Sequence, residues 1–479
     1  MSLLVPDLRI HAPRQGPPRQ GGEFVLYWMQ GIAMRVEGNF AFNFAAQQAD
    51  LLGLPLLVYQ GLRPDYPWAS DRIHTFILES VGDLQQEFRD RGVQYAFYLA
   101  QTTEGPYTSA KRESGPRESW GAGALDPSQP SPLVQLAERA AVVVTEYSPT
   151  FIHPRQTKRL REKVTTPVIA VDTAGVVPLA AITKAHPTAR GFRTDIQRHF
   201  PEHLRVVGTA EPKVRRRIEL PFDPTEVRDI PALVAGCDID HSVPPSPTIR
   251  GGSRAARARL AHFLKHGLPR YADDRGDPNV DSTSRLSPHL HFGTIGIQEV
   301  LFAAKEAGTA DQYARFEDEA VTWRELAWNY CHHEPKHRTV KGIPAWAVKE
   351  LSDHEADPRQ LYTDEQLEQG RTEDELWNAA QRSLVRDGEM HNYVRMLWGK
   401  GVLPWTRNAA EALRVLEHLN HKYALDGRDP GSYGGIFWIF GKFDRPFYRR
   451  PVFGTVRYMS TRAARNKFDV DAYVKRAGG

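Results

Sequence analysis

The spacing of apolar residues changes once along this chain, and the change limits the folds that it can adopt. In the first part, segments of helical spacing alternate with short apolar runs, which fall at 24–28, 55–60, 95–99 and 141–145. Such alternation favours a parallel, doubly wound sheet with helices on both faces. Beyond Gly251 and Gly252 the apolar spacing becomes helical, so the second part is predicted to be mostly α-helical.

These patterns predict an α/β domain with a Rossmann-like parallel sheet, followed by a helical domain. The expected regions are a disordered lead-in at 1–22, the α/β domain at 23–182, a proline-rich interdomain linker at 183–250 and the helical domain at 251–479. A Gly/Pro/Ser-rich stretch at 102–130 lacks periodicity and is interpreted as a surface insertion of undefined role.

Cysteine and hydropathy content exclude several classes of protein. The chain has only two cysteines, Cys237 and Cys331, which are too few for a four-cysteine iron–sulfur cluster or a cysteine-rich zinc site. No metal site is therefore predicted. No apolar run reaches the roughly 18–20 residues of a membrane span, and the N-terminus lacks a secretory apolar core. We expect a cytoplasmic protein without a membrane partner.

Charge is distributed unevenly along the chain. The net charge is +4, but residues 441–479 contain ten lysines and arginines against three aspartates, so the preceding residues carry a net charge of −3. Such asymmetry favours a phosphate-bearing partner. A solvated basic tail explains the charge equally well.

Three local motifs allow both a chemical and a structural interpretation. The hydroxyls of Thr283, Ser284 and Ser287 precede a proline, and they can bind phosphate or simply cap a helix. Glu319 and Trp323 lie four residues apart and therefore on one face of a predicted helix. They can be a functional pair, or a surface acid beside a buried indole. Tryptophans in the last third of the chain are most often core residues.

Taken together, Thr283–Ser287, the string MHNYVRMLW at 390–398 and LDGRDP at 425–430 resemble the photolyase/cryptochrome family. The resemblance spans 24–475 and is closest to class II cyclobutane pyrimidine dimer (CPD) photolyases. It implies a carbon–carbon lyase that binds damaged DNA, is monomeric, and splits pyrimidine dimers by electron transfer from excited, reduced FAD. A second antenna chromophore, a deazaflavin or another, is possible in this family. Two alternatives stay open: a cryptochrome-type blue-light photoreceptor without lyase activity, and a flavin-free nucleic-acid-binding scaffold.

The resemblance also assigns roles to individual residues. Asn420 is expected near flavin N5, Arg395 and Asp426 as an ion pair beside the ring, and Glu319 at the carbonyl of the dimer. The relay that re-reduces the flavin would be Trp377, Trp398 and Trp405, with Trp398 nearest the flavin. The implied FAD contacts are Tyr271, Thr283, Ser284, Arg285, Leu286, Ser287, Arg324, Asn392, Arg395, Asn420 and Asp426. The implied lesion or DNA contacts are Arg275, Glu319, Trp323, Tyr393, Met396, Trp438, Arg445 and Arg457.

Several positions depart from the class II pattern. Gly38 and Phe40 lie in a segment where class II members carry other residues, Asn392 replaces a glycine, His421 an aspartate and Phe443 a histidine. These departures leave open the identity of any antenna and the preference for CPD or (6-4) lesions.

Overall fold

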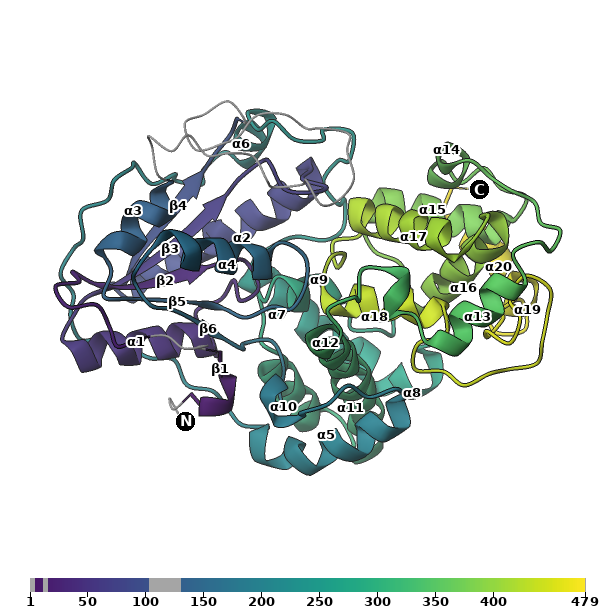
Figure 1. Ribbon diagram of the computed structural model, residues 1–479, viewed down its shortest axis with the longest axis horizontal. Helices are drawn as coiled ribbons and strands as arrows, with labels where there is room; N and C mark the ends of the chain where they lie inside the picture. The colour runs from purple at the N-terminus through teal and green to yellow at the C-terminus, as the bar shows by residue number, and fades with distance from the viewer. Residues whose placement is uncertain (1–4, 12–15, 103–130, 479) are drawn as a thin grey trace.

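The computed structural model describes residues 5–11, 16–102 and 131–478, and Figure 1 shows a sheet-containing part on the left and a helical part on the right. The insertion predicted at 102–130 lies almost wholly outside the described residues. A six-stranded sheet has the order β1-β6-β5-β2-β3-β4. Its parallel strands are β2 (Val25–Met29), β3 (Leu56–Leu62), β4 (Gln94–Leu99), β5 (Val142–Glu146) and β6 (Val168–Val171).

The crossover helices cover the sheet and explain why its strands are apolar throughout. Every residue of β2 and of β5 is buried, as expected when helices cover both faces of a parallel sheet. The crossovers are α1 (Phe40–Leu52), α2 (Asp71–Asp90), α3 (Pro132–Arg139) and α4 (His153–Lys163). The start of α1 is fixed by the Asn39 side chain, which accepts a hydrogen bond from the Phe42 amide at 3.1 Å. The predicted α/β fold class is confirmed.

Residues 5–11 correct the expectation of a disordered lead-in. They form a 3₁₀ turn, η1 (Asp7–Arg9), and an antiparallel edge strand, β1 (Ile10–His11), beside β6. The Arg9 side chain is buried, donates to the Val176 carbonyl at 2.5 Å and lies 4.0 Å above the Phe40 ring. This buried guanidinium holds the segment against the α/β domain, a long-range contact that local composition does not reveal.

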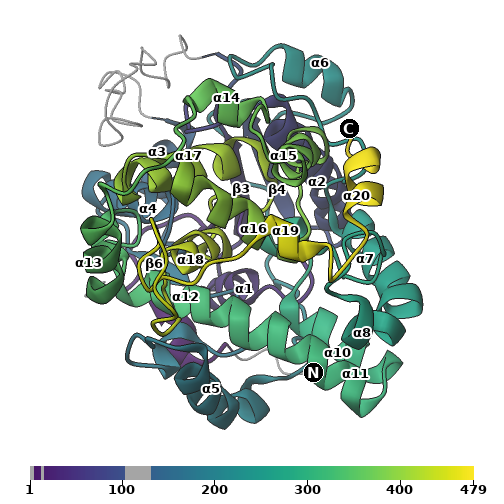
Figure 2. The same ribbon diagram turned by 90° about the vertical axis from the view of Figure 1, so that its right-hand side faces the viewer.

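The predicted linker contains regular structure. After η2 (Leu179–Ala181), the segment 183–250 forms α5 (Ala189–His203) and α6 (Ile230–Ala235). Phe192, Ile196 and Phe200 of α5 belong to the same hydrophobic core as the helical part, and α5 lies at the lower edge of that part in both views (Figures 1 and 2). Its apolar face, not a change in composition, decides where this segment packs.

The helical part surrounds one large core that includes Trp377, Trp398 and Phe437. Its long helices are interrupted by π-helical and 3₁₀ turns. The elements are α7 (Ser253–His262), η3 (Phe263–Gly267), η4 (Leu268–Arg270), α8 (Tyr271–Asp274), α9 (Ser287–His291), α10 (Ile297–Ala307), α11 (Ala310–Glu317), η5 (Asp318–Trp323), α12 (Arg324–His333), η6 (Val340–Gly342), α13 (Ala345–Asp353), α14 (Asp364–Glu368), α15 (Glu375–Asp387), α16 (Asn392–Val402), η7 (Leu403–Trp405), α17 (Ala409–Tyr423), α18 (Pro430–Ile439), α19 (Thr461–Ala464) and α20 (Val470–Arg476).

Over the described ranges, no helix combines the length and the apolar character needed to cross a membrane. The same residues contain no cluster of three or more His, Cys, Asp or Glu side chains suited to a metal ion. Cys237 and Cys331 are both free and buried.

Candidate active site

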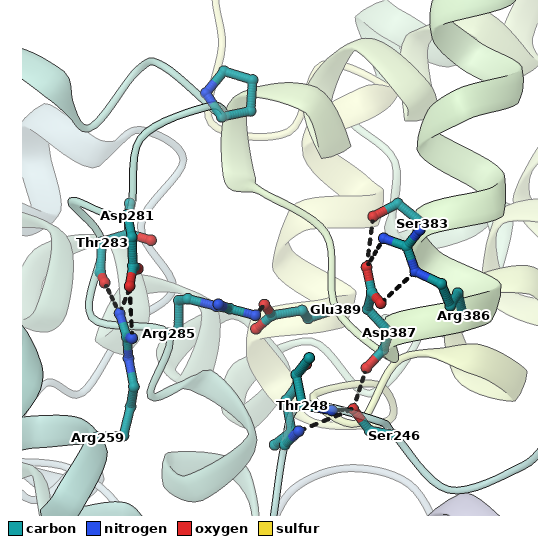
Figure 3. Close-up of polar contacts among 12 residues, drawn as sticks. Ser246, Thr248, Arg259, Asp281, Thr283, Arg285, Ser383, Arg386, Asp387 and Glu389 are labelled. Atoms are coloured by element: carbon teal, nitrogen blue, oxygen red, sulfur yellow. Dashed lines mark hydrogen bonds and ion pairs between the residues drawn. The ribbon is translucent and has the colours of Figure 1, made fainter. Parts of the chain in front are cut away.

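The hydroxyl-rich loop before α9 is held in place by an arginine that the sequence analysis missed. Arg259 of α7 donates to the Thr283 carbonyl at 2.7 Å and the Ser284 carbonyl at 2.9 Å, and it pairs with Asp281 at 2.7 Å (Figure 3). Arg285, the residue after Ser284, has a left-handed backbone conformation with a φ of 52°. The Arg259 guanidinium therefore holds the loop through its backbone carbonyls.

Arg285 connects this loop to a distant part of the helical domain. Figure 3 shows its side chain extending across a gap to Glu389, with which it forms an ion pair. The segment that carries Glu389 is fixed in turn by Asp387. The carboxylate of Asp387 accepts from Arg386 at 2.7 Å, and its carbonyl accepts from the Ser246 hydroxyl at 2.6 Å. Two rigid segments therefore face each other and are joined by one ion pair.

Asn420 and Asp426 form a second polar group on α17 and the turn that follows it. The amide nitrogen of buried Asn420 donates to Ser432 Oγ at 3.0 Å, and Ser432 Oγ donates to the Asp426 carbonyl at 2.8 Å. Arg395 of α16 binds the Asp426 carboxylate at 3.0 Å. The predicted Arg395–Asp426 contact is thus present, and Ser432 sets the orientation of Asn420.

Glu319 and Trp323 lie in η5, the π-helical turn between α11 and α12. Such turns are rare and often occur at functional sites. Arg275 forms an ion pair with Glu319, and its guanidinium lies 6.0 Å from the Tyr271 ring. Burial raises the pKa of the Tyr271 phenol, which therefore stays neutral. Trp323 is 38% exposed, whereas most other tryptophans are buried or half-buried. The site offers a half-buried acid beside an accessible indole.

The three relay candidates form a continuous stack. Trp377 is parallel to Trp398, with centroids 6.2 Å apart, and it meets Trp405 edge-on at 5.2 Å. The order is therefore Trp398, Trp377, Trp405. Trp398 and Trp405 do not lie on one α-helix, because α16 ends at Val402 and the 3₁₀ turn η7 begins at Leu403.

Hydrogen bonds fix two of these indoles. Trp377 Nε1 donates to the Trp398 carbonyl at 2.8 Å, and Trp398 Nε1 donates to Gln381 Oε1 at 3.0 Å. Tyr362 lies edge-on to Trp405 at 5.4 Å and is half-buried. The sequence did not predict this contact, because nothing local distinguishes Tyr362. It extends the aromatic series toward the surface.

Two basic side chains lie close to the Trp438 ring. Lys400 Nζ is 4.9 Å from its ring centre and Arg457 Cζ is 5.5 Å from it. Arg457 also binds Asp444 at 2.8 Å. Lys400 is buried, donates to the Ile439 carbonyl at 2.7 Å, and has a pKa lowered to about 7 by desolvation. Burial of this lysine could not be predicted from a glycine-flanked position at the end of a helix.

Other predicted residues take different places. The Arg324 guanidinium reaches across the domain border and donates to the Ala174 carbonyl at 2.9 Å. Leu286 is completely buried, and Asn392 is exposed at the start of α16. Tyr393 and Met396 are half-buried on the same helix.

The departures from the class II pattern are mostly packing residues. His421 is completely buried; its Nδ1 accepts from the Arg428 amide at 3.0 Å, and its ring meets Trp68 edge-on at 5.0 Å. Phe443 is buried with a left-handed backbone at φ 67°. Gly38 also has a positive φ, 61°.

No protein-family model matches this chain. Similar curated proteins span nearly its whole length, and all three named here are deoxyribodipyrimidine photo-lyases. That of Methanothermobacter thermautotrophicus is 33% identical and covers 96% of both chains. That of Oryza sativa subsp. japonica is 34% identical over 98% of this chain and 91% of its own. That of Potorous tridactylus is 31% identical over 94% and 80%.

Solved structures share the fold at lower identity. A class III photolyase from Agrobacterium tumefaciens has a TM-score of 0.65 at 18% identity, covering 97% of this chain and 87% of its own. A Synechocystis cryptochrome has a TM-score of 0.65 at 16% identity, covering 97% and 89%. A photolyase from Sulfolobus tokodaii with two FAD molecules has a TM-score of 0.62 at 18% identity, covering 95% and 90%.

Proposed function

This chain belongs to the photolyase/cryptochrome family, and we propose that it is a deoxyribodipyrimidine photo-lyase that splits cyclobutane pyrimidine dimers in DNA under light. The observation that carries the proposal is the π-helical turn η5, which presents Glu319 beside an accessible Trp323. An exposed indole offers a stacking face to a planar base, and a neighbouring carboxyl can, when protonated, donate a hydrogen bond to a pyrimidine carbonyl.

The residues of the helical domain fit FAD. A diphosphate requires N–H and O–H donors, and the loop held by Arg259 offers the hydroxyls of Thr283, Ser284 and Ser287. Within the described structure the neighbouring Ser282 hydroxyl is buried without a hydrogen-bond partner, as expected of a donor that serves a ligand. Arg395 and Asn420 would contact the flavin ring from α16 and α17. When bound, reduced FAD supplies light absorption and the electron that opens the dimer.

The remaining residues divide into substrate contacts and an electron route. In its protonated form, released from the ion pair with Arg275, Glu319 would donate a hydrogen bond to a dimer carbonyl, where negative charge develops. Trp323 and Trp438 would form apolar walls for the extruded bases. Electrons would pass inward from Trp405 through Trp377 to Trp398, which is expected nearest the flavin.

We also propose the class II subtype, on the strength of Asn420 and the tryptophan series. The two free, buried cysteines fit the predicted cytoplasmic location, in a reducing compartment. A monomeric state and a second, antenna chromophore stay predictions.

The test starts from purified protein. Its absorption spectrum should show a flavin, and blue light should remove dimers from a thymine-dimer oligonucleotide while a dark sample stays unchanged. A parallel (6-4) substrate should not be repaired. A flavin spectrum without dimer loss would support a cryptochrome-type photoreceptor instead, and a colourless protein that binds DNA would support a flavin-free scaffold.

A further inference from the structure

A groove of about 420 Å³ lies at the edge of the sheet where the parallel strands begin. Leu56 and Gln94, the first residues of β3 and β4, belong to its lining. Doubly wound sheets bind their usual ligands at the opposite edge, where the strands end. The groove shares no residue with the FAD and DNA sites proposed above, so it is a separate feature of the α/β domain. Its volume is in the range of pockets that bind small molecules.

Two glutamine side chains fix one wall of this groove, which is formed by the segment that follows α5. The Gln94 side chain donates to the Ile218 carbonyl and accepts from the Ile218 amide, both at 2.8 Å. In the same way Gln85 donates to the Thr225 carbonyl at 2.8 Å and accepts from the Val227 amide at 3.1 Å. Both contacts use protein groups alone, so the groove is formed before a ligand binds and binding need not order this segment.

Three consecutive arginines, Arg215, Arg216 and Arg217, line the groove and are exposed. Arg215 donates to the Arg91 carbonyl at the end of α2. Arg216 donates to the Glu23 carbonyl at 2.9 Å. A carbonyl orients a guanidinium but does not neutralise its charge. Among the described residues the Arg217 side chain has neither a hydrogen bond nor an ion pair, so it is available to a ligand.

The lining carries an excess of positive charge. It contains four arginines and, among its described residues, a single acid, which gives the groove a net charge of +3. That acid, Glu226, lies 3.6 Å from an Arg89 nitrogen, and both side chains are more than half exposed. Such an exposed pair is weak. Leu56 and Val93 add apolar atoms to the same lining.

We propose that this groove binds a free nucleoside phosphate, with its phosphates on Arg216 and Arg217 and its base against Leu56 and Val93. Guanidinium groups bind phosphate oxygens through paired, charge-assisted hydrogen bonds. A bounded volume favours a small ligand over a duplex, whose backbone requires a longer basic track. The inference does not depend on the proposed function, because the groove uses none of the residues assigned to repair.

The experiment measures ATP binding to the purified full-length chain by isothermal titration calorimetry. Arg217→Ala should weaken ATP binding about tenfold, because one charge-assisted phosphate contact is lost. The variant should fold normally, since this side chain has no polar partner in the described structure. Arg190→Ala on α5 removes the same charge from another exposed position and should leave ATP binding within about twofold. The absorption spectrum before and after each titration shows whether any bound flavin has been displaced.

Glu226→Gln provides a test in the opposite direction. It removes the acid of the lining and releases Arg89, so ATP binding should tighten about threefold. A damaged fold cannot produce such a gain.

Two fragments of ATP test the assignment to a nucleoside phosphate. Tripolyphosphate should bind more weakly than ATP, and adenosine should not bind detectably, because each lacks one part of the recognised chemistry. No ATP binding by the parent, equal ATP affinity in the parent and Arg217→Ala, or tripolyphosphate as tight as ATP would overturn the inference. A 5′-phosphorylated oligonucleotide that binds more tightly than ATP, and loses this affinity in Arg217→Ala, would overturn it in favour of a strand end.

Discussion

At the scale of one residue, Glu319 is expected to act in dimer splitting and much less in DNA binding. Glu319→Ala should lower the repair yield of bound lesion, because the carboxyl acts where charge develops. The loss corresponds to at most about 3 kcal/mol of transition-state stabilisation. DNA affinity should change much less, since the tryptophans and arginines provide most of the binding. Repair yield at saturating DNA checks the prediction, and Glu317→Ala on α11 is the matched control. An effect on affinity alone would contradict the assigned role.

Lys400 gives a prediction for pH dependence. Burial lowers its folded pKa to about 7, below the value of about 10.4 expected in the unfolded chain. Between these values the unfolded state binds more protons, so the lysine's contribution to stability rises with pH from about 7 to about 10. The unfolding free energy of the parent relative to Lys400→Met should therefore increase across this window, by at most about 1.4 kcal/mol per pH unit.

Urea midpoints of both proteins at several pH values measure this difference, in which the other titrating groups largely cancel. A difference that stays flat or falls between pH 7 and pH 10 would show that Lys400 keeps its charge in the folded protein.

At the scale of elements, the Arg285–Glu389 pair joins two segments that face each other in Figure 3. Because Arg285 belongs to the loop proposed to bind FAD, Arg285→Ala or Glu389→Ala should speed FAD release about fivefold, corresponding to about 1 kcal/mol for a partly exposed pair. The charge-exchanged double variant should recover part of the retention. Release on dilution, followed by flavin fluorescence, is the measurement. Arg407→Ala, which removes a surface pair with Glu411, should leave release unchanged.

Spacing predicted most elements but not their interruptions. The strands at 24–28 and 141–145 were predictable because every residue in them is apolar or nearly so. The π-helical turn at Asp318–Trp323 was not, since its neighbours continue the helical pattern on both sides. Pro404 is a sequence signal for the end of α16, because a proline cannot donate the backbone hydrogen bond that continues a helix.

At the scale of the whole molecule, buried arginines join the two parts. Arg72 of α2 donates to the carbonyls of Tyr423 at 2.8 Å and Val385 at 2.6 Å, at the ends of α17 and α15. Arg72→Met should cost at least about 3 kcal/mol of unfolding free energy, because these buried acceptors lose their donor. The urea midpoint measures the loss. Arg89→Met, on the same helix but largely exposed, should change it by no more than about 0.5 kcal/mol.

Contacts of this kind mark the limit of sequence reasoning. Arg72, Arg9 and Arg259 look like ordinary surface arginines in the sequence, and only long-range packing shows that they bind backbone carbonyls. The residues predicted by family resemblance include real contacts, such as Arg395 with Asp426, but the supports that orient them, Arg259 and Ser432, come from the fold.

We propose that this chain splits pyrimidine dimers with light, and that its tryptophans only supply the resting electron. The most direct measurement is the loss of thymine dimers under blue light by chemically pre-reduced parent and Trp398→Phe proteins, each with a dark control. We expect equal repair by both proteins in light and none in darkness, although Trp398→Phe should fail to photoreduce oxidised flavin. Absence of light-dependent repair by the reduced parent would contradict it.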